Sequence, residues 1–575
     1  MLGKRGPQSD LVEADQLYVE HVGRDSFYGF LAGQRRQLFR DEDFAALYCP
    51  DNGRPSVPPS LLATVLLLQT HDGVSDEEAK ARADFDLRWK VALGIGLADR
   101  PFAKSALQLF RAQLILHDRV RAVFQRSLAF ARGTGYLRSR KMRAVLDTSY
   151  ILGRGAVKDT YNLLADGIVR LIRVLAKRAG RGPAAWAAAH DLSRYVGSSV
   201  KGEAAIDWGD PAARQAFLRG VVADADRLLE IARRTLGVMA SDDPGVERLR
   251  GAADVLGRLL LQDIERPTDG PVLKQGVSPD RVVAVHDPEM RHGRKSATKR
   301  FDGHESAIAV DPESQLVTAA AVLPDNAQDH EQALELVEQA EVNADAVVAE
   351  TVGDCAFGDS DTRRVFAAAG RPLVAKVADR RDQAYFPKEA FRIDLQAMTC
   401  TCPGGQECGT VVSIGSGARY GAPGAPLRAF RFDAAVCDAC PLRPSCVRAR
   451  PGRGRLVMLH PSEAILQEAR AFQRSGAFAP YRTLRQAAEH RLARLMQLGM
   501  RQARYVGRAK TLFQLLLAAT VANLTLVATR VGLMRGRRRC TAHRLARVLG
   551  SLVMLLTTCR PSPTPSRRHR LWAAT

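Results

Sequence analysis

Residues 281–376 combine strand-like and helix-like hydrophobic patterns, and this alternation limits the fold more than any other feature of the chain. Short apolar runs predict strands at 282–285, 306–310, 316–322, 346–352 and 373–376. Helical spacing predicts helices at 329–340 and from about residue 360. The resulting order is strand, strand, strand, helix, strand, helix, strand. Such an order is typical of an α/β fold in which helices cover a mixed sheet.

A further strand of this sheet is predicted far upstream, where apolar residues at 142 and 144–146 lead into Asp147. The sheet is therefore expected to be discontinuous in sequence. The residues between its parts, 155–280, are predicted to be helical, because Asp210-Pro211 and Asp243-Pro244 each resemble an N-cap followed by proline at the first helical position. Residues 30–135 are also predicted to be helical, with Ser75 opening a capping box.

Positive charge is concentrated at the C-terminal end of the chain. The net charge is +22, from 84 Lys and Arg against 62 Asp and Glu. No Asp or Glu follows Glu489, whereas 17 Lys and Arg do. This excess favours a polyanionic partner, with nucleic acid ahead of an anionic membrane surface. The basic end is interpreted either as a solvated tail or as a phosphate-binding face whose affinity would fall steeply with salt.

Two features bear on compartment and membrane. Residues 1–30 mix charged and apolar positions and lack the apolar core of a signal peptide, which predicts a cytoplasmic protein. The uncharged run 511–529 is long enough to span a bilayer, but it includes polar Gln514, Thr520 and Asn523. A buried core helix is the preferred interpretation of this run, and a membrane anchor is the alternative.

Six of the ten cysteines lie between Cys400 and Cys446. In a chain without a secretory signal, this clustering favours metal binding in a reducing compartment over a disulfide framework. A Cys-x-x-Cys pair is present, and this spacing lets two thiolates hold one tetrahedral ion. The alternative is reduced cysteines without a metal. The predicted zinc ligands are Cys402, Cys437, Cys440 and Cys446, with Cys400 or Cys408 as substitutes for Cys402.

Acidic residues recur at predicted strand ends and on one predicted helix. Asp147 and Asp354 each follow a strand, and Glu489 lies on a helix predicted within 463–533. Carboxylates that share a sheet can ligate two divalent ions about 3.5–4 Å apart, which activate water or a 3′ hydroxyl against a phosphodiester. Asp287 also follows a strand and competes for a metal role, the alternative being a turn initiated by Asp-Pro.

The order of four segments resembles the DDE transposases of bacterial insertion sequences, in the branch with a helical N-terminal domain and a split, RNase H-like core. The resemblance covers roughly residues 30–530. It is carried by Gly53–Pro55 with 58–68 and 105–111, by Val145–Ser149, by Asp287–Phe357 with its Gly353-Asp354 pair, and by Arg485–Glu489 followed by Gly507 and Asn523.

The resemblance implies particular site residues and cofactors. Asp147, Asp354 and Glu489 would be the catalytic ligands of Mg²⁺ or Mn²⁺. Arg485, one helical turn before Glu489, would bind DNA phosphate, which suits a planar, permanently charged guanidinium. The other residues expected to contact DNA are Tyr481, Arg482, Arg501, Arg504, Arg508 and Lys510.

The expected domains follow from the resemblance and from the pattern of elements. The α/β catalytic domain has an RNase H-like mixed sheet with helices, and it is interrupted by a helical and a Cys-rich insertion. The expected ranges are 1–140 for the helical N-terminal DNA-binding domain, 141–160, 281–380 and 461–533 for the catalytic domain, 161–280 for the helical insertion, 381–460 for the Cys-rich, zinc-binding insertion and 534–575 for the basic tail.

The expected function is DNA transposition. The protein would hydrolyse a phosphodiester at each element end and use the freed 3′ hydroxyl for strand transfer. Its partners would be double-stranded DNA with terminal inverted repeats and further copies of itself in a homo-oligomer, close to the nucleoid and without a membrane. The alternatives are a non-catalytic DNA-binding protein derived from a decayed transposase and a membrane-associated basic protein.

Overall fold

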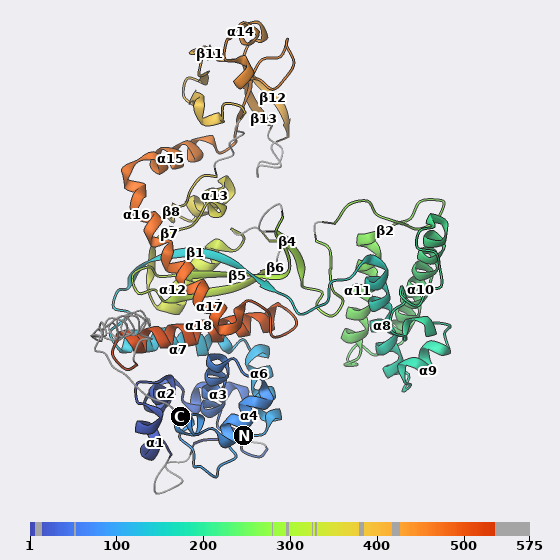
Figure 1. The fold of residues 1–575 in the computed structure, drawn as a ribbon, viewed down its shortest axis with the longest axis vertical. Helices are drawn as coiled ribbons and strands as arrows, with labels where there is room; N and C mark the ends of the chain where they lie inside the picture. The colour runs from blue at the N-terminus through green and yellow to red at the C-terminus, as the bar shows by residue number, and fades with distance from the viewer. Residues whose placement is uncertain are drawn as a thin grey trace, which may run out of the picture.

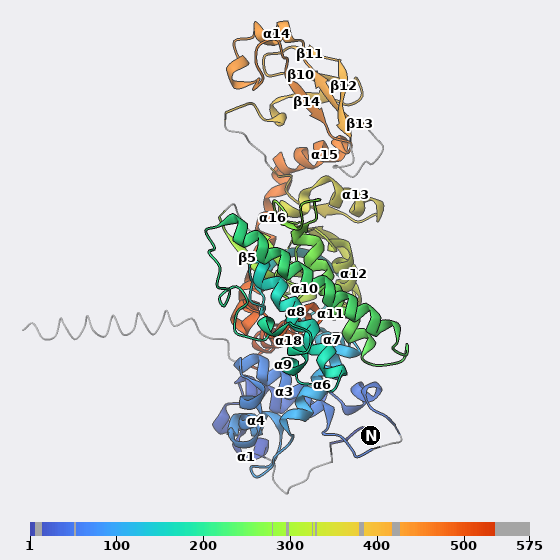
Figure 2. The same ribbon diagram turned by 90° about the vertical axis from the view of Figure 1, so that its right-hand side faces the viewer.

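The computed structural model describes the chain except for residues 6–13, 51–52, 279, 295–297, 325, 328–329, 379–383, 417–425 and 535–575. N-terminal helices occupy one end of the long axis, a sheet lies in the middle, and the Cys-rich segment forms the other end (Figures 1 and 2). A helical insertion lies beside the sheet (Figure 1). The predicted basic tail lies, apart from Met534, outside the described residues.

The central sheet is mixed, as predicted. Its strands are β1 (Lys141–Leu152), β4 (Arg291–Arg294), β5 (Arg300–Val310), β6 (Val317–Pro324), β7 (Val347–Val352) and β8 (Leu373–Val374). The order is β4-β5-β1-β7-β8. β4 pairs with the first part of β5, residues 300–303, and β6 pairs with the rest of β5, residues 304–310. The strands β4, β5, β6 and β1 pair antiparallel, whereas β1, β7 and β8 pair parallel. The predicted α/β fold class is confirmed.

Two strand predictions were wrong in detail. Residues 282–285 are buried but form no strand, because the Gln262 side chain bonds both the N–H and the C=O of Val282, at 2.8 and 3.0 Å. A side chain thus satisfies the backbone that a neighbouring strand would otherwise pair. β1 also continues five residues past Asp147, because β5 pairs with it as far as Leu152.

The N-terminal part is helical, as predicted. Its helices are α1 (Ala14–Val22), α2 (Phe27–Leu38), α3 (Pro59–Asp72), α4 (Asp76–Phe85), α5 (Leu87–Leu93), α6 (Lys104–Leu116) and α7 (Val120–Gly133). The Ser75 hydroxyl accepts a hydrogen bond from the Glu78 N–H at 3.1 Å and caps α4, as the sequence indicates. Apolar residues of these helices share one buried core with the sheet.

A buried carboxylate, Asp72 at the end of α3, links this helix to three others. It accepts hydrogen bonds from the Tyr28 hydroxyl at 2.9 Å and from Trp89 Nε1 at 2.8 Å, and it pairs with Arg82 at 2.8 Å. Burial works to raise the pKa of Asp72, but hydrogen bonds from His71, Trp89 and Tyr28 outweigh it and lower the pKa to about 2. The ionised form is therefore favoured by folding.

We expect Asp72→Asn to destabilise the protein near neutral pH by roughly 1–2 kcal/mol. Because the pKa of Asp72 falls from 3.8 to about 2 on folding, this stabilisation is complete above about pH 4 and is lost as the pH falls toward 2. The difference in urea midpoint between wild type and variant should therefore shrink over that window. An equal difference at pH 7 and below pH 3 would contradict the linkage.

The helical insertion has its own core. It contains α8 (Thr160–Arg178), α9 (Pro183–Ala188), α10 (Pro211–Gly237), α11 (Val246–Asp263) and a small ribbon of β2 (Ile264–Glu265) and β3 (Val272–Leu273). Asp210 caps α10, as predicted. The expected start of the next helix at Pro244 is wrong, because Asp243 closes a turn by accepting the Gly245 N–H at 2.7 Å and α11 begins only at Val246.

The Cys-rich segment contains two small sheets. The first has β9 (Arg392–Asp394), β10 (Thr399–Thr401) and β11 (Glu407–Cys408), and the second has β12 (Val411–Ser416), β13 (Pro426–Arg431) and β14 (Leu456–Leu459). A short helix, α14 (Ala434–Asp438), follows β13. Its buried residues form a cluster separate from the core of the sheet, and they include cysteines.

The remaining helices surround the sheet or connect it to the Cys-rich segment. They are α12 (Ala333–Ala344), α13 (Ser360–Ala368), α15 (Glu463–Arg474), α16 (Ala479–Leu484), α17 (Gln486–Leu495) and α18 (Arg508–Arg530). α12 begins later than predicted, at Ala333. α17 packs on β1 and β5, and α18 packs on β6, α7 and α3.

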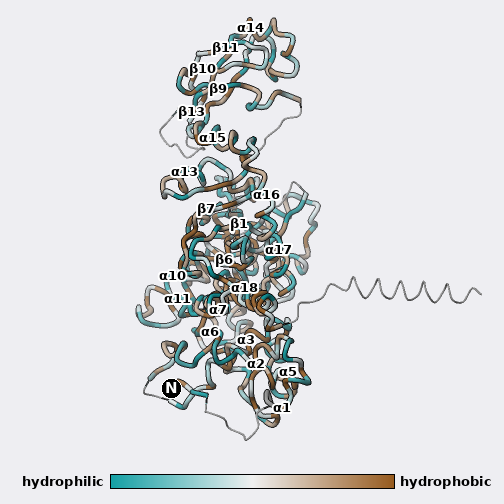
Figure 3. The backbone as a smooth tube through the Cα atoms, turned by 90° about the vertical axis from the view of Figure 1, so that its left-hand side faces the viewer, coloured by the Kyte–Doolittle hydropathy of each residue, from teal (hydrophilic) through white to brown (hydrophobic). Residues whose placement is uncertain are grey.

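α18 is the helix predicted from the uncharged run 511–529. By length and composition it could cross a membrane, and it is the single such helix among the described residues. In the structure it lies between the N-terminal helices and the sheet (Figure 1) and is coloured as hydrophobic along much of its length (Figure 3). Most of its hydrophobic residues are buried. The prediction of a buried core helix is confirmed.

Candidate active site at the ends of the parallel strands

Asp147 and Asp354 lie at the same level of the sheet. Val145 of β1 pairs with Val352 of the parallel strand β7. Each aspartate follows its member of this pair by two residues, so the two occupy equivalent positions along adjacent parallel segments. Asp147 is inside β1, opposite Ile308 of β5, whereas Asp354 follows the end of β7.

Glu489 approaches the same place from a helix. It lies in the first turn of α17, which packs on β1. Burial raises the pKa of Asp147 to about 6, against a hydrogen bond from the Thr148 N–H at 2.9 Å. Asp354 and Glu489 raise it further, and Arg485 lowers it. The charges of Asp354, Glu489 and Arg485 therefore all act on the Asp147 carboxyl.

The other two carboxylates are held differently from Asp147. Asp354 is half-buried, and its Oδ1 accepts a hydrogen bond from the Ala356 N–H at 2.8 Å, which fixes its orientation. Glu489 is exposed and lies 3.8 Å from Arg485 in an ion pair along the helix. This pair leaves the Glu489 carboxylate facing solvent, where a cation can reach it.

The donor chemistry suits a hard divalent cation. Three carboxylates can supply oxygen ligands. A bound cation would stabilise the charged form of Asp147, which burial disfavours first and the charges of Asp354 and Glu489 disfavour to a smaller extent. Within the described part of the chain, however, no group of three or more His, Cys, Asp or Glu side chains is arranged to hold a metal ion. The carboxylates interact electrostatically without surrounding one common point.

Asp287, the competing metal candidate, has structural partners. It is fully buried, and its Oδ2 contacts His304 Nε2 at 3.3 Å and accepts the Gly507 N–H at 3.1 Å. Burial acts to raise the pKa of Asp287, but the bonds from His304 and Gly507 lower it. Its own C=O accepts the Met290 N–H at 3.1 Å, which closes the turn expected at Asp-Pro. Asp287 thus ties this turn to the start of α18.

The residues expected to contact DNA divide into two groups. Arg482, Arg501 and Lys510 are exposed. The others contact acidic side chains of the chain: Tyr481 donates to Glu350 at 2.8 Å, Arg485 pairs with Glu489 at 3.8 Å, Arg504 lies 3.5 Å from Asp76, and Arg508 lies 3.2 Å from Glu289.

The acidic partners were not found from the sequence. Asp76 belongs to α4 and Glu289 to the turn after Asp287, both remote from α18 in the chain. No local pattern distinguishes them from solvated acids, so only the tertiary fold reveals that they lie within ion-pair distance of these arginines.

The predicted zinc ligands gather around one small cavity. Cys402, Cys437, Cys440 and Cys446 line it together with Phe432 and Arg455. Cys400 and Cys408, the substitutes for Cys402, do not line it. They are instead partners across β10 and β11. All six are free thiols.

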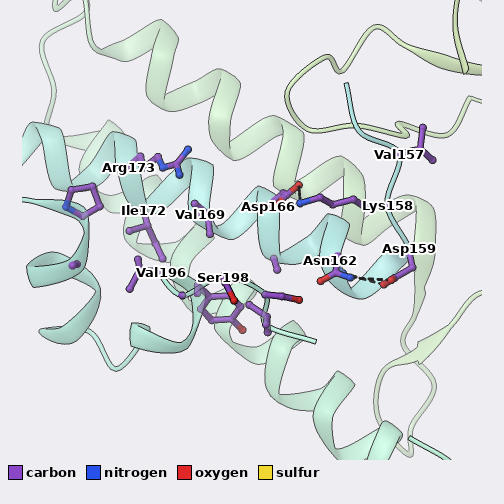
Figure 4. Close-up of a pocket in the computed structure, with 17 residues that line it drawn as sticks. Val157, Lys158, Asp159, Asn162, Asp166, Val169, Ile172, Arg173, Val196 and Ser198 are labelled. Carbon is purple, nitrogen blue, oxygen red and sulfur yellow. Dashed lines mark hydrogen bonds and ion pairs between the residues drawn. The ribbon is translucent and has the colours of Figure 1, made fainter. Parts of the chain in front are cut away.

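A larger pocket of about 730 Å³ lies in the helical insertion, between α8 and residues 195–200 (Figure 4). Three of the four charged side chains that line it, those of Lys158, Asp159 and Asp166, have partners within the insertion. Lys158 pairs with Asp166 at 2.8 Å, and Asp159 accepts the Asn162 N–H at 3.2 Å as the cap of α8. These charges do not converge on the cavity, so the site at the sheet remains the better candidate.

Two segments of the chain match known protein families. Residues 30–113 match the family described as "Transposase domain (DUF772)", and residues 401–528 match "Transposase DDE domain". These two matches support a DDE transposase of insertion-sequence type. No curated protein and no solved structure matches the chain. The second match includes Glu489 and the four cysteines of the cavity, whereas Asp147 and Asp354 lie outside both matches.

Proposed function

We propose that this transposase cleaves DNA at the ends of its element and joins the freed 3′ hydroxyl to target DNA. The observation that carries the proposal is the placement of the three acids: Asp147 and Asp354 follow the paired residues Val145 and Val352 of adjacent parallel strands, and Glu489 lies on α17, which packs on β1. A phosphodiester is an anion, so a cluster of carboxylates can serve its cleavage only with cations that screen both.

The metal ligands in this proposal are Asp147, Asp354 and Glu489. When bound, Mg²⁺ or Mn²⁺ activates the attacking water or 3′ hydroxyl and stabilises the leaving oxygen. Asp354 is oriented for ligation by the Ala356 N–H. Glu489 would exchange its ion pair with Arg485 for a metal ligand. Arg485 would then be released to bind a DNA phosphate beside the reacting bond.

The test uses the purified full chain and a supercoiled plasmid that carries the element ends. We expect nicking at the ends with Mg²⁺ or Mn²⁺ and none with EDTA. Addition of a target plasmid should yield joined products. Cleavage at unrelated positions on a plasmid without the ends would contradict specific transposition.

A second candidate, a DNA-binding protein without catalysis, is favoured by one observation: no three-ligand group is already arranged for a metal among the described residues. Specific binding to the element ends without cleavage at any divalent concentration would support this candidate. Inverted repeats and a homo-oligomer that holds two ends together belong to both proposals.

The exposed and the paired basic residues of α18 should contribute differently to DNA affinity. Lys510 is exposed, whereas Arg508 lies 3.2 Å from Glu289. Lys510→Ala is expected to reduce the slope of log affinity against log salt by about 1, because one phosphate contact releases about one counterion. Arg508→Ala should reduce it less.

Fluorescence anisotropy with end DNA over a range of salt concentrations measures both slopes. Lys177→Ala, an exposed lysine in the last turn of α8, is the control for loss of net charge. Equal slopes in Lys510→Ala and Lys177→Ala would contradict a DNA-binding role for Lys510.

A further inference from the structure

The Cys-rich segment has little apolar core of its own. Its buried residues come from short strands and loops, and Cys400, Cys408 and Cys437 are among them. Small units of this kind usually need a cross-link or a metal to fold stably. The six thiols are free, so a disulfide does not supply this cross-link.

The fold brings four of these thiols to one place. Cys402 begins a tight turn, in which its C=O accepts the Gly405 N–H at 2.9 Å. Cys437 lies near the C-terminus of α14, and Cys440 and Cys446 follow this helix in the chain. All four line one cavity of about 30 Å³, although they come from segments more than thirty residues apart in sequence.

Two features of the surroundings suit thiolates. A Cβ atom added to Gly404 would lie 3.6 Å from Cys440 Sγ and 3.7 Å from Cys402 Sγ, so these two sulfurs lie close to the same glycine. The Arg455 N–H lies 3.5 Å from Cys437 Sγ and donates to it. A backbone donor of this kind stabilises the charge of a metal-bound thiolate.

The two remaining cysteines of the segment, Cys400 and Cys408, do not line the cavity. Cys400 pairs with Cys408 across β10 and β11, and Cys400 is fully buried. The Cys408 thiol donates to the Arg431 C=O at 3.1 Å, away from the cavity. The structure therefore selects Cys402 over both substitutes that the sequence left open.

We infer that Cys402, Cys437, Cys440 and Cys446 bind one zinc ion that holds the Cys-rich segment together. Four thiolates form a closed tetrahedral site, which is structural and leaves no position for a reacting water. Because no three of the described Cys, His, Asp or Glu side chains are already arranged around one point, the thiols would draw inward and close the small cavity on binding. The inference is independent of the proposed function, since it uses none of the three carboxylates.

The Cys-rich segment contacts α15, the helix that leads toward Glu489. Lys388 in the Cys-rich segment forms an ion pair with Glu463 of α15, and Arg470 of α15 lies 3.2 Å from Glu389. α15 leads through α16 to α17, which carries Glu489 (Figure 1). Loss of the zinc ion should therefore loosen the attachment of α15.

The test measures metal in the full chain expressed with zinc. We expect one zinc ion per chain by mass spectrometry, and after exchange with Co²⁺ the visible absorption of a tetrahedral thiolate site. Cys437→Ser and Cys440→Ser should each weaken zinc binding at least about tenfold, whereas Cys408→Ser and the exposed Cys355→Ser should retain it. Cys446→His should also retain zinc, because histidine is an alternative ligand.

Two results would overturn the inference. One is wild-type protein that contains no zinc and gives no tetrahedral cobalt spectrum. The other is equal loss of zinc in Cys408→Ser and Cys440→Ser. The cobalt spectrum of the wild type decides the question even if a serine variant fails to fold. DNA cleavage is not part of the readout, so failure of this inference and failure of the proposed function are distinguishable.

Discussion

Asp354→Asn is expected to lower cleavage of element-end DNA by roughly a thousandfold or more, while DNA binding is retained. Asparagine keeps the shape of aspartate, and its side-chain oxygen can still accept the Ala356 N–H. The substitution removes only the negative charge. In the proposed function, the charged Asp354 carboxylate is a ligand of the cation. This cation supplies several kcal/mol of transition-state stabilisation.

The measurement is the rate of strand nicking in Mg²⁺, with DNA affinity determined separately by anisotropy. Asp361→Asn is the matched control, since this aspartate lies in the first turn of α13 and pairs at the surface with Arg364 at 3.0 Å. We expect near wild-type cleavage from it. Cleavage by Asp354→Asn within a few fold of wild type would remove this residue from the active site.

Asn523→Leu is expected to destabilise the protein by about 3 kcal/mol or more. Asn523 is fully buried in α18 and bonds both backbone groups of Val317 on β6, accepting its N–H and donating to its C=O, each at 2.9 Å. It also donates to the Ser127 hydroxyl of α7 at 3.2 Å. Leucine would leave three buried polar groups without this partner, and each costs about 1–3 kcal/mol.

Thr520→Val is the matched control on the same helix. Thr520 is also fully buried, but its hydroxyl donates to the Leu516 C=O within α18, at 2.7 Å. Because that carbonyl also belongs to the helix ladder, loss of the hydroxyl should cost much less. Urea unfolding followed by circular dichroism compares the two variants. Equal destabilisation would show that volume, and not the bond to β6, determines the effect.

The sequence predicted those parts of the site that depend on local pattern. The apolar run before Asp147 and the strand before Asp354 follow from hydrophobic period alone, because side chains alternate along a strand. The register between these two strands does not follow from the hydrophobic period. It depends on the pairing of Val145 with Val352, which is a contact between segments that the helical insertion separates in sequence.

Partners of single charges were equally beyond local pattern. Arg504 and Arg508 are of the residue type expected on a DNA-binding surface. Each, however, lies within ion-pair distance of an acid from another part of the chain. The choice of Cys402 over Cys408 also depends on which way each thiol faces, and this is fixed by the hairpin of β10 and β11.

The sequence by itself determined the elements: the α/β class, the capped helices, the buried apolar run 511–529, the basic end and the clustered cysteines. These follow from hydrophobic period, helix capping and composition, which act over a few residues. Tertiary structure alone decided that residues 282–285 form no strand, that Asp147 and Asp354 share one level, and that α18 is tied to β6 through Asn523. These depend on long-range pairing, in which each buried polar group must find a partner wherever the fold supplies one.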